Sequence, residues 1–430
     1  LLKNAPVPSQ IAWDSNGNGK LDTSDFQIPM IVRDGKVHLE AVWLANRAAI
    51  DSGLYRHTSD YPRVNYLPRA TRFNLIADVP LKIKSAQGRN PFSQKSFVLV
   101  NSTVDGAWPS RRNRPVITRK PLPPQIWKGT KQFEGTHYFD ASVRIEPGTK
   151  ILLASGASLV FRNRLEVAGI DSAPVIITAL NKNKPFGLVA LQGPGTAGSS
   201  LRYLHMDGGS GGRLRNIQYT AMLNIHNSHD IDLLSVKLKN NHTFDDMAHI
   251  VYTNNVRITD IALQNSNMDA IDIDISKNIR FTRGEIIASG NDGIDLMSSD
   301  VTIDNMTITG SKDKGISVGE ASIAHIAGTR FHNNVIGIES KDGSLVQVTK
   351  SSFINNKSQL NAYKKNWRYG TGGKIEVQNS HFNGIKNIIK ASKNSSIRVS
   401  ASSMNPKEPP GKRVTFEGII APPDGMRAPQ

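Results

Sequence analysis

A short strand pattern recurs along the chain, and its clearest copies are Val256-Arg257-Ile258, Ile279-Arg280-Phe281 and Val301-Thr302-Ile303. In each copy two apolar residues flank a polar one, which is the alternation of a strand with one buried face. The last apolar residues of the three copies are 23 and 22 residues apart. Further copies have anchors at Leu233, Ile326, Val348, Val377 and Val399. A strand repeat of about 22 residues predicts one turn of a β-solenoid per repeat.

Asparagine recurs in the corners between these strands, at positions 240–241, 265–267, 291, 333–334 and 355–356. Asparagine tolerates the left-handed backbone conformation of a tight corner and can stack its amide from coil to coil. A β-sandwich with asparagine-rich loops would not hold this register over seven units. Right-handed crossovers dominate parallel connections. We therefore predict an all-β fold, a right-handed parallel β-helix.

The repeat divides the chain into three parts. Residues 136–405 form the predicted β-helix, and residues 1–135, which lack the repeat, form a region that caps the open end of the stack. The proline-rich residues 406–430 are expected to terminate it, because proline cannot donate to a strand ladder. The glycine-rich stretch from Gly193 to Gly212 is expected to be a loop that leaves one corner and overhangs the functional face.

Composition limits the partners. The chain has 53 Lys and Arg against 36 Asp and Glu, a formal charge of +17, which favours a polyanion. The basic residues are scattered, which argues against nucleic acid, and no apolar run approaches the ~18 residues of a membrane span. The absence of cysteine excludes disulfides, thiolate metal sites and a cysteine nucleophile. We expect a secreted, extracellular bacterial protein, with its signal peptide removed, that is a monomer and binds an acidic polysaccharide.

A candidate calcium loop lies near the start of the sequence. Side-chain oxygens occupy positions 1, 3, 5, 9 and 12 of a twelve-residue stretch, namely Asp14, Asn16, Asn18, Asp22 and Asp25. Gly19 supplies the sharp bend, and Lys20 would donate its backbone carbonyl. The stretch resembles the calcium loops of EF-hands and, more closely, of dockerins. It predicts a structural Ca²⁺ site that stabilises the N-terminal region; the alternative is a solvated polar turn.

Superposed repeats place ionisable residues in columns, one strand spacing of about 4.8 Å apart. The first column is Asp246, Asp269, Asp292 and Lys314. The second is His249, Asp272, Asp295, Ser317 and Glu339, and a looser third line is Asp274, Glu320, Lys341 and Asp342. Stacked like charges destabilise a sheet, so these columns indicate a functional site rather than a requirement of folding. Such carboxylates serve as general acid and base, or hold a catalytic divalent cation; a solvated acidic face is the alternative.

Two units in these columns resemble a known superfamily. Ser289-Gly290-Asn291-Asp292-Gly293-Ile294-Asp295 and Asp313-Lys314-Gly315-Ile316-Ser317-Val318-Gly319-Glu320 resemble the right-handed β-helix proteins that include pectate lyases, alginate and chondroitin lyases and polygalacturonases. The first unit is similar to the aspartate-bearing coils of polygalacturonases, but their Gly-His-Gly and Arg-Ile-Lys motifs are missing. The helix as a whole resembles the RbmB-type proteins of Vibrio biofilm clusters. That resemblance implies a lyase that cuts an acidic exopolysaccharide.

A lyase needs a cation for the uronate carboxylate, a base for the C5 proton and a donor to the leaving oxygen. His249 is the expected base and Lys314 the alternative, with Asp272, Asp295, Asp292 and Asp269 as the acids. Arg280, Lys341, Glu320 and Asp246 are expected to bind substrate. Two other functions stay open: an inverting glycoside hydrolase that uses the four aspartates, and a non-catalytic polysaccharide-binding matrix protein.

Overall fold

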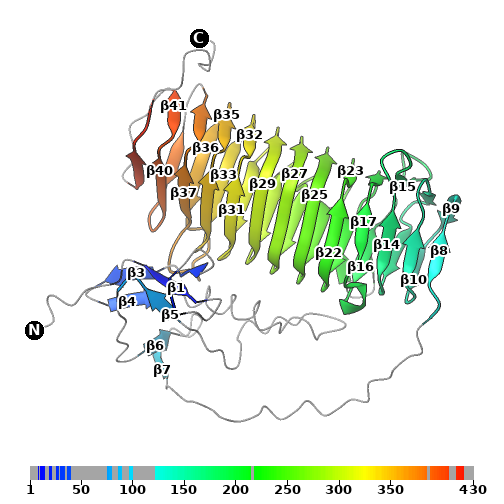
Figure 1. The fold of residues 1–430 in the computed structure, drawn as a ribbon, viewed down its shortest axis with the longest axis horizontal. Coiled ribbons are helices and arrows are strands. Elements are labelled where there is room, and N and C mark those ends of the chain that lie inside the picture. The colour runs from blue at the N-terminus through cyan, green and yellow to red at the C-terminus, as the bar shows by residue number, and fades with distance from the viewer. Residues whose placement is uncertain are drawn as a thin grey trace, which may run out of the picture. The chain divides into compact units, whose positions relative to one another are not determined.

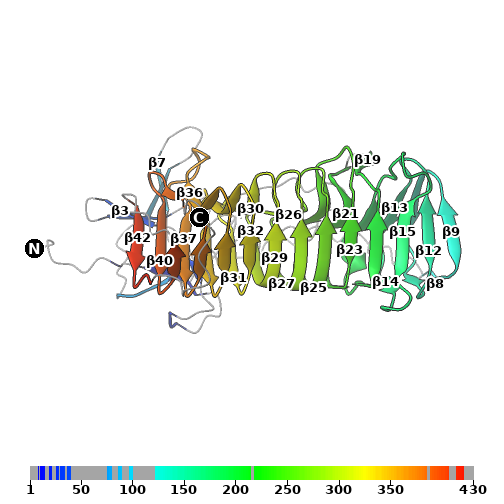
Figure 2. The same cartoon turned by 90° about the horizontal axis from the view of Figure 1, so that it is seen from above.

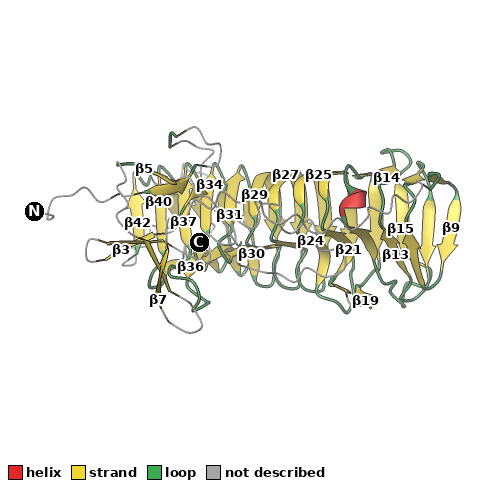
Figure 3. Ribbon diagram, turned by 90° about the horizontal axis from the view of Figure 1, so that it is seen from below, coloured by secondary structure: helices red, strands yellow, loops and turns green. Residues whose placement is uncertain are grey.

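The structure is a computed structural model that describes residues 8, 10–14, 19–21, 26–28, 30–33, 36–39, 75–79, 86–89, 96–99, 122–214, 217–384, 388–405 and 413–420. Within these residues almost every element is a strand, and one short 3₁₀ helix, η2 (Pro194–Thr196), interrupts them (Figure 3). No helix in the described residues is long and apolar enough to cross a membrane. The chain divides into two compact units, one of which contains Leu1–Ala41 and Arg72–Pro123.

The N-terminal unit contains small antiparallel sheets. Strand β1 (Ile11–Trp13) pairs with β2 (Phe26–Gln27) on one side and with β5 (Leu75–Ala77) on the other. Two hairpins are formed by β3 (Met30–Arg33) with β4 (Lys36–Leu39) and by β6 (Ala86–Arg89) with β7 (Ser96–Leu99). The capping role of this region stays a prediction.

The second unit contains a parallel β-helix of about 12 turns, with about 23 residues per turn. Its strands lie side by side from β8 (Gln125–Trp127) to β42 (Val414–Glu417) (Figures 1 and 2). The predicted anchors pair in register, with Ile258 opposite Phe281 and Phe281 opposite Ile303. The predicted fold is therefore confirmed. The ladder also extends past both predicted boundaries, because β8 begins before residue 136 and β42 pairs with β40 (Ser396–Ser400) after residue 405.

The strands of the β-helix belong to two ladders. The first is an 11-stranded sheet, which we call the site sheet: β10 (Thr136–Phe139), β13 (Ser158–Phe161), β16 (Val189–Gln192), β21 (Ala221–His226), β24 (Asp246–Val251), β26 (Ile271–Asp274), β28 (Ile294–Met297), β30 (Lys314–Gly319), β33 (Ile336–Lys341), β36 (Ser358–Tyr363) and β39 (Ile389–Ala391). The second is a 22-stranded sheet, which we call the wide sheet: β8, β9 (Thr130–Phe133), β11 (Val143–Ile145), β12 (Lys150–Leu153), β14 (Leu165–Ala168), β15 (Val175–Ala179), β17 (Ser200–Arg202), β18 (Leu204–Asp207), β22 (His229–Leu234), β23 (Lys237–Lys239), β25 (Asn254–Gln264), β27 (Lys277–Ile287), β29 (Asp300–Thr309), β31 (Ile323–Ala327), β32 (Arg330–His332), β34 (Leu345–Thr349), β35 (Ser352–Ile354), β37 (Lys374–Gln378), β38 (His381–Asn383), β40, β41 (Ser403–Asn405) and β42.

The core runs along the axis of the helix. Most apolar residues of both sheets point inwards and form one continuous cluster of buried side chains. Phenylalanines stack along it, with ring centroids of Phe331 and Phe353 4.9 Å apart and those of Phe353 and Phe382 4.8 Å apart. Each fully buried side chain of this size contributes about 1.5–3 kcal/mol. The repeat therefore fixes the register, because a slip by one residue would turn these side chains outwards.

Asparagines make the corners as predicted. Asn240, Asn265, Asn333 and Asn355 have φ between 53° and 59°, the left-handed region. The Asn265 side chain donates to Asn240 Oδ1 at 3.1 Å, one coil away. The corner amides thus satisfy each other along the stack.

The prediction for Gly193–Gly212 was wrong. This stretch contains β17 and β18, two regular strands of the wide sheet, as well as η2. Its glycines occupy positive-φ or crowded positions within coils, for example Gly208 at φ 82°. The excursion from the helix comes later, as a hairpin of β19 (Gly212–Leu214) and β20 (Ile217–Tyr219).

Candidate functional site

The site sheet carries the second predicted column on its outer face, and Asp269, Asp292, Glu320 and Asp342 of the other two lie at the corners beside its strands. Strand β26 shows why: Ile271 and Ile273 are buried in the core, so Asp272 and Asp274 point outwards. The ladder pairs His249 with Asp272, Asp272 with Asp295, Asp295 with Ser317 and Ser317 with Glu339. The predicted juxtaposition of these five residues is therefore confirmed, and their chemical roles stay a proposal.

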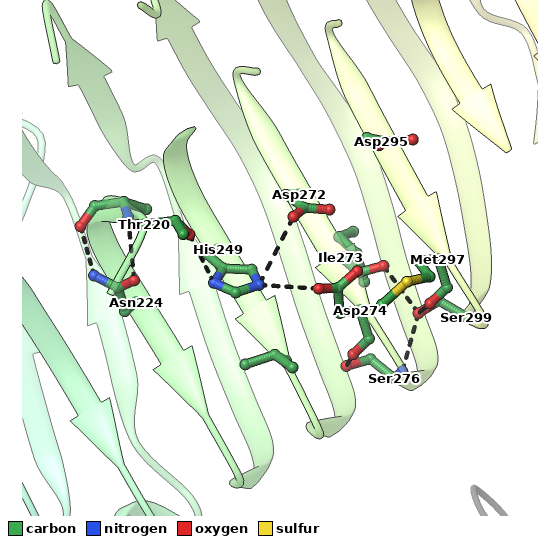
Figure 4. Close-up of polar contacts among 12 residues, drawn as sticks. Thr220, Asn224, His249, Asp272, Ile273, Asp274, Ser276, Asp295, Met297 and Ser299 are labelled. Carbon is green, nitrogen blue, oxygen red and sulfur yellow. Dashed lines mark hydrogen bonds and ion pairs between the residues drawn. The ribbon is translucent and has the colours of Figure 1, made fainter. Parts of the chain in front are cut away.

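His249 is held between two sets of oxygen atoms (Figure 4). Its Nδ1 lies 3.0 Å from Thr220 Oγ1, and its Nε2 lies 3.4 Å from Asp274 Oδ2 and 3.8 Å from Asp272 Oδ2. Burial alone would lower the pKa of His249, but the hydrogen bond and charge of Asp274 outweigh that effect and raise it. The ring is thus oriented at both nitrogens and has two carboxyl groups beside one of them.

Three more carboxyl groups gather one to two coils further on. Single oxygen atoms of Asp269, Asp292 and Asp295 lie within 4.8 Å of one another. Asp269 Oδ1 accepts hydrogen bonds from the Asn291 side chain and the Asp292 N–H, both at 2.7 Å. Burial, reinforced by like charges, raises the pKa of Asp269 to about 6. Burial also raises the pKa of Asp292 to about 7, despite the opposing charge of Lys314.

Asp272 is the most perturbed acid of the second column. Burial raises its pKa well above the ordinary range, and the charges of Asp274, Asp246 and Asp295 raise it further. This raised pKa favours the protonated form of Asp272, whose Oδ2 lies 3.8 Å from His249 Nε2.

Two lysines face the acids. Lys314 Nζ lies 3.4 Å from Asp292 Oδ1 and also contacts Asp313. Lys341 Nζ donates to Ser317 Oγ at 2.9 Å and lies 3.8 Å from Asp295 Oδ1. Burial opposes their charge, but neighbouring carboxylates, Asp292 for Lys314 and Asp295 for Lys341, raise the pKa of both. Both lysines therefore serve as fixed cations, which favours His249 over Lys314 as the base.

The remaining predicted residues are partly displaced from the site. Asp246 belongs to it, and burial raises the pKa of Asp246 to about 7. Glu320 follows β30 at a corner, where burial raises its pKa to about 7. Arg280, contrary to expectation, does not lie with the columns but on β27 of the wide sheet, where it forms an ion pair with Asp304 at 3.4 Å. Its role in substrate binding stays a prediction.

The hairpin β19–β20 borders the site and was not predicted. Leu214, Ile217 and Tyr219 pack on outward residues of β13 and β16, so that Val160 and Ala190 are fully buried. Tyr219 also stacks on His226, with ring centroids 4.9 Å apart. Thr220, which holds His249 Nδ1, directly follows β20. The hairpin thus covers the outer face up to the coil that precedes His249.

Among the residues that the structure describes, two groups of side chains have the donor set of a divalent cation site. They are His249 with Asp272 and Asp274, and Asp269 with Asp292 and Asp295, each with ligand atoms within 4.8 Å. Carboxylates with or without one imidazole suit Ca²⁺, Mn²⁺ or Zn²⁺. A catalytic divalent cation stays a prediction.

In the candidate calcium loop, Asp14 is buried and its Oδ2 accepts a hydrogen bond from the Gly19 N–H at 2.9 Å. This contact closes the loop as the predicted bend requires. The ligands Asn16, Asn18, Asp22 and Asp25 lie outside the described residues. Calcium binding stays a prediction.

Among the solved structures compared with this chain, one aligns well enough to support the fold. The catalytic unit of a thermostable alpha-1,3-glucanase from Streptomyces thermodiastaticus aligns with a TM-score of 0.51 at 11% identity, over 69% of this chain and 62% of that one. An alginate lyase from Paenibacillus aligns with a TM-score of 0.33 at 13% identity, over 64% of this chain and 93% of that one. The A-module of a mannuronan C-5 epimerase from Azotobacter vinelandii aligns with a TM-score of 0.41 at 14% identity, over 66% of this chain and 91% of that one.

A search of curated proteins gave no match. Likeness at these identities shows the fold alone. The family model described as a right handed beta helix region matches residues 223–407, which include the coils with the columns. The outward acids, His249 and the two lysines thus stand on a right-handed parallel β-helix.

Proposed function

We propose that this protein is a polysaccharide lyase that cleaves a uronate-containing polymer by β-elimination. The observation that carries the proposal is the pairing of His249 Nε2 with Asp272 Oδ2 at 3.8 Å. Elimination needs a base, an acid and a cation together. This face supplies the base and the acid on adjacent coils, and beside them the carboxyl group cluster of Asp269, Asp292 and Asp295, which suits a divalent cation. A hydrolase that works with two carboxyl groups needs neither the histidine nor the lysines.

The step balances without water. His249 Nε2 takes the proton from C5 of a uronate. The electron pair of the broken C5–H bond forms the C4–C5 double bond. The bond between C4 and the glycosidic oxygen breaks, and the carboxylic acid of Asp272 protonates that oxygen. The carboxylate on C5 would be neutralised by a divalent cation held by Asp269, Asp292 and Asp295, because Lys314 and Lys341 lie three and four strand spacings from His249. Neutralisation makes the C5 proton more acidic.

The contact between His249 and Asp272 also restores the protonation states of both residues after each turnover. After one turnover His249 carries a proton and Asp272 has lost one. Their 3.8 Å separation is bridged by a small side-chain movement or by one water, so the imidazolium returns the proton to Asp272. Because Asp274 raises the pKa of His249, the neutral base becomes more abundant as the pH rises above neutrality.

A glycoside hydrolase is the second candidate, favoured by Asp272, whose pKa is raised by burial and which lies one coil from Asp295. An inverting enzyme separates its two carboxyl groups by about 6.5–9.5 Å to admit a water. Oxygen atoms within the group of Asp269, Asp292 and Asp295 approach to 4.8 Å. An inverting mechanism would therefore have to combine acids from different groups.

The substrate and setting follow from the charge and the resemblance. A net charge of +17 favours an acidic polymer. We place the protein outside a bacterial cell, where the RbmB-type lyases that it resembles act on biofilm exopolysaccharide.

A substrate panel tests the proposal. The protein is incubated with alginate, polygalacturonate, hyaluronate and chondroitin, and both ultraviolet absorbance and reducing ends are followed. Absorbance that rises with reducing ends supports elimination, because the new double bond absorbs. Reducing ends without absorbance would show hydrolysis and overturn the lyase. Binding without either signal would leave a polysaccharide-binding protein.

A further inference from the structure

The connection from β36 to β37, residues 364–373, is an enlarged corner of the site sheet. One coil earlier the same corner takes only residues 342–344. The longer connection starts directly after Tyr363, which pairs in register with Lys341. This 364–373 loop therefore leaves the sheet at the edge where Lys341 lies.

Buried contacts fix the base of the loop. Asp342 is completely buried, and its Oδ1 accepts hydrogen bonds from the N–H groups of Lys365 and Asn366, both at 2.7 Å. Asn366 Oδ1 in turn accepts from the Arg368 N–H at 3.0 Å, and Tyr369 is buried beneath the turn. The base of the loop is thus held by hydrogen bonds to Asp342, the residue that follows Lys341.

The turn presents an aromatic ring and positive charges. Trp367 is 62% exposed, and Lys365 and Arg368 are exposed beside it. Residues 364–373 contain three cations and no acid, whereas carboxyl groups dominate the nearby columns. An indole offers a flat apolar face to the C–H groups of a sugar ring, and a guanidinium pairs with a carboxylate in two-point geometry. Together they match a polymer of sugar acids.

We propose that the 364–373 loop is a binding arm for a uronate polymer, with Trp367 against a sugar ring and Lys364, Lys365 and Arg368 against carboxylates. The inference rests on the proposed function for the identity of the polymer. Five strand spacings of about 4.8 Å separate β24 from β36, so the arm lies about 24 Å along the sheet from His249. It holds a stretch of the chain several sugars from the bond that breaks.

Affinity electrophoresis of the full chain tests the arm, with alginate, polygalacturonate or hyaluronate in the gel and neutral dextran as the blank. Trp367→Ala should weaken retardation by at least one uronate polymer about 10-fold. Ile126→Ala, which removes another exposed apolar side chain on β8, should not change it. The triple variant Lys364→Ala, Lys365→Ala, Arg368→Ala should reduce the salt dependence of binding, and Lys237→Ala with Lys239→Ala on β23 should not.

The outcomes separate the two proposals. Wild-type retardation by a uronate polymer that both arm variants keep would overturn the arm, and so would the absence of retardation by all three polymers. Retardation that is lost in Trp367→Ala, but without any ultraviolet product from the wild type, would support the arm and contradict the lyase. Ultraviolet product formed with an unchanged KM in Trp367→Ala would contradict the arm and leave the lyase standing.

Discussion

The two sheets of the β-helix treat charge in opposite ways. On the wide sheet, exposed opposite charges pair from coil to coil: Arg257 with Asp232 at 3.5 Å, and Arg283 with Asp260 at 2.8 Å. On the site sheet, acids stack on acids and are buried, which raises the pKa of Asp272 and Asp292. The same ladder geometry thus produces pairs of opposite charge on one side and, on the other, stacked acids that two lysines compensate only in part. Folding explains the first arrangement, and the second is typical of a functional site.

The largest expected effect is on catalysis. His249→Ala should lower kcat/KM by about 100-fold or more, because it removes the base, while the fold is kept. His332→Ala on the wide sheet is the matched control and should leave turnover unchanged. The rate of double-bond formation on the substrate found in the panel measures both. Wild-type turnover in a folded His249→Ala protein would remove the functional distinction between the sheets.

The second effect is on stability. Lys341→Met should destabilise the protein by about 3 kcal/mol. The reason is that the buried ammonium group of Lys341 is the cation beside Asp295, Glu320 and Glu339. Arg283→Met breaks an exposed pair on the wide sheet and should cost less than about 1 kcal/mol. Denaturant unfolding measures the two variants side by side. Equal losses would show that burial does not distinguish the two sets of charges.

The third effect is on the pH dependence of stability. Burial raises the pKa of Asp292 to about 7, so between about pH 4 and 7 the folded state binds more protons than the unfolded chain. The free energy of unfolding therefore falls as the pH rises through this range. Asp292→Asn removes this contribution and should reduce the fall in Tm between pH 5 and pH 8, on the order of 5 °C. Asp260→Asn is the control on the wide sheet. The slope with pH is decisive, since Asp292→Asn also removes one of the two carboxylate partners of Lys314.

The smallest effect concerns Arg280. It pairs with Asp304 on the wide sheet, so Arg280→Ala should change the KM for the polymer by less than about twofold. Lys341→Ala at the site sheet should raise it clearly more. A large rise in KM for Arg280→Ala would place a binding surface on the wide sheet as well.

The sequence allowed the columns to be predicted because a parallel, in-register ladder turns a repeat into a straight line of side chains. His249, Asp272 and Asp295 followed directly from the period. Thr220 could not be found this way, because it follows a hairpin that lies outside the repeat. Arg280 was misplaced because the period assigns a residue to a coil but does not say which sheet faces the substrate. The many glycines of Gly193–Gly212 led to the wrong prediction of a loop. Several of them occupy crowded positions within regular coils, where a side chain would not fit.

The hairpin β19–β20 closes one end of the outer face of the site sheet. Tyr219 and its neighbours bury Val160 and Ala190, so a ligand on the outer face cannot continue from His249 towards β16 and β13. A polymer lying along this face therefore extends from His249 one way, towards β36. The end of such a polymer would lie against the hairpin. The cleaved bond would then lie at a fixed number of sugars from that end. If the protein is the lyase proposed above, such a face would release short products of uniform length from one terminus and leave the remaining polymer long.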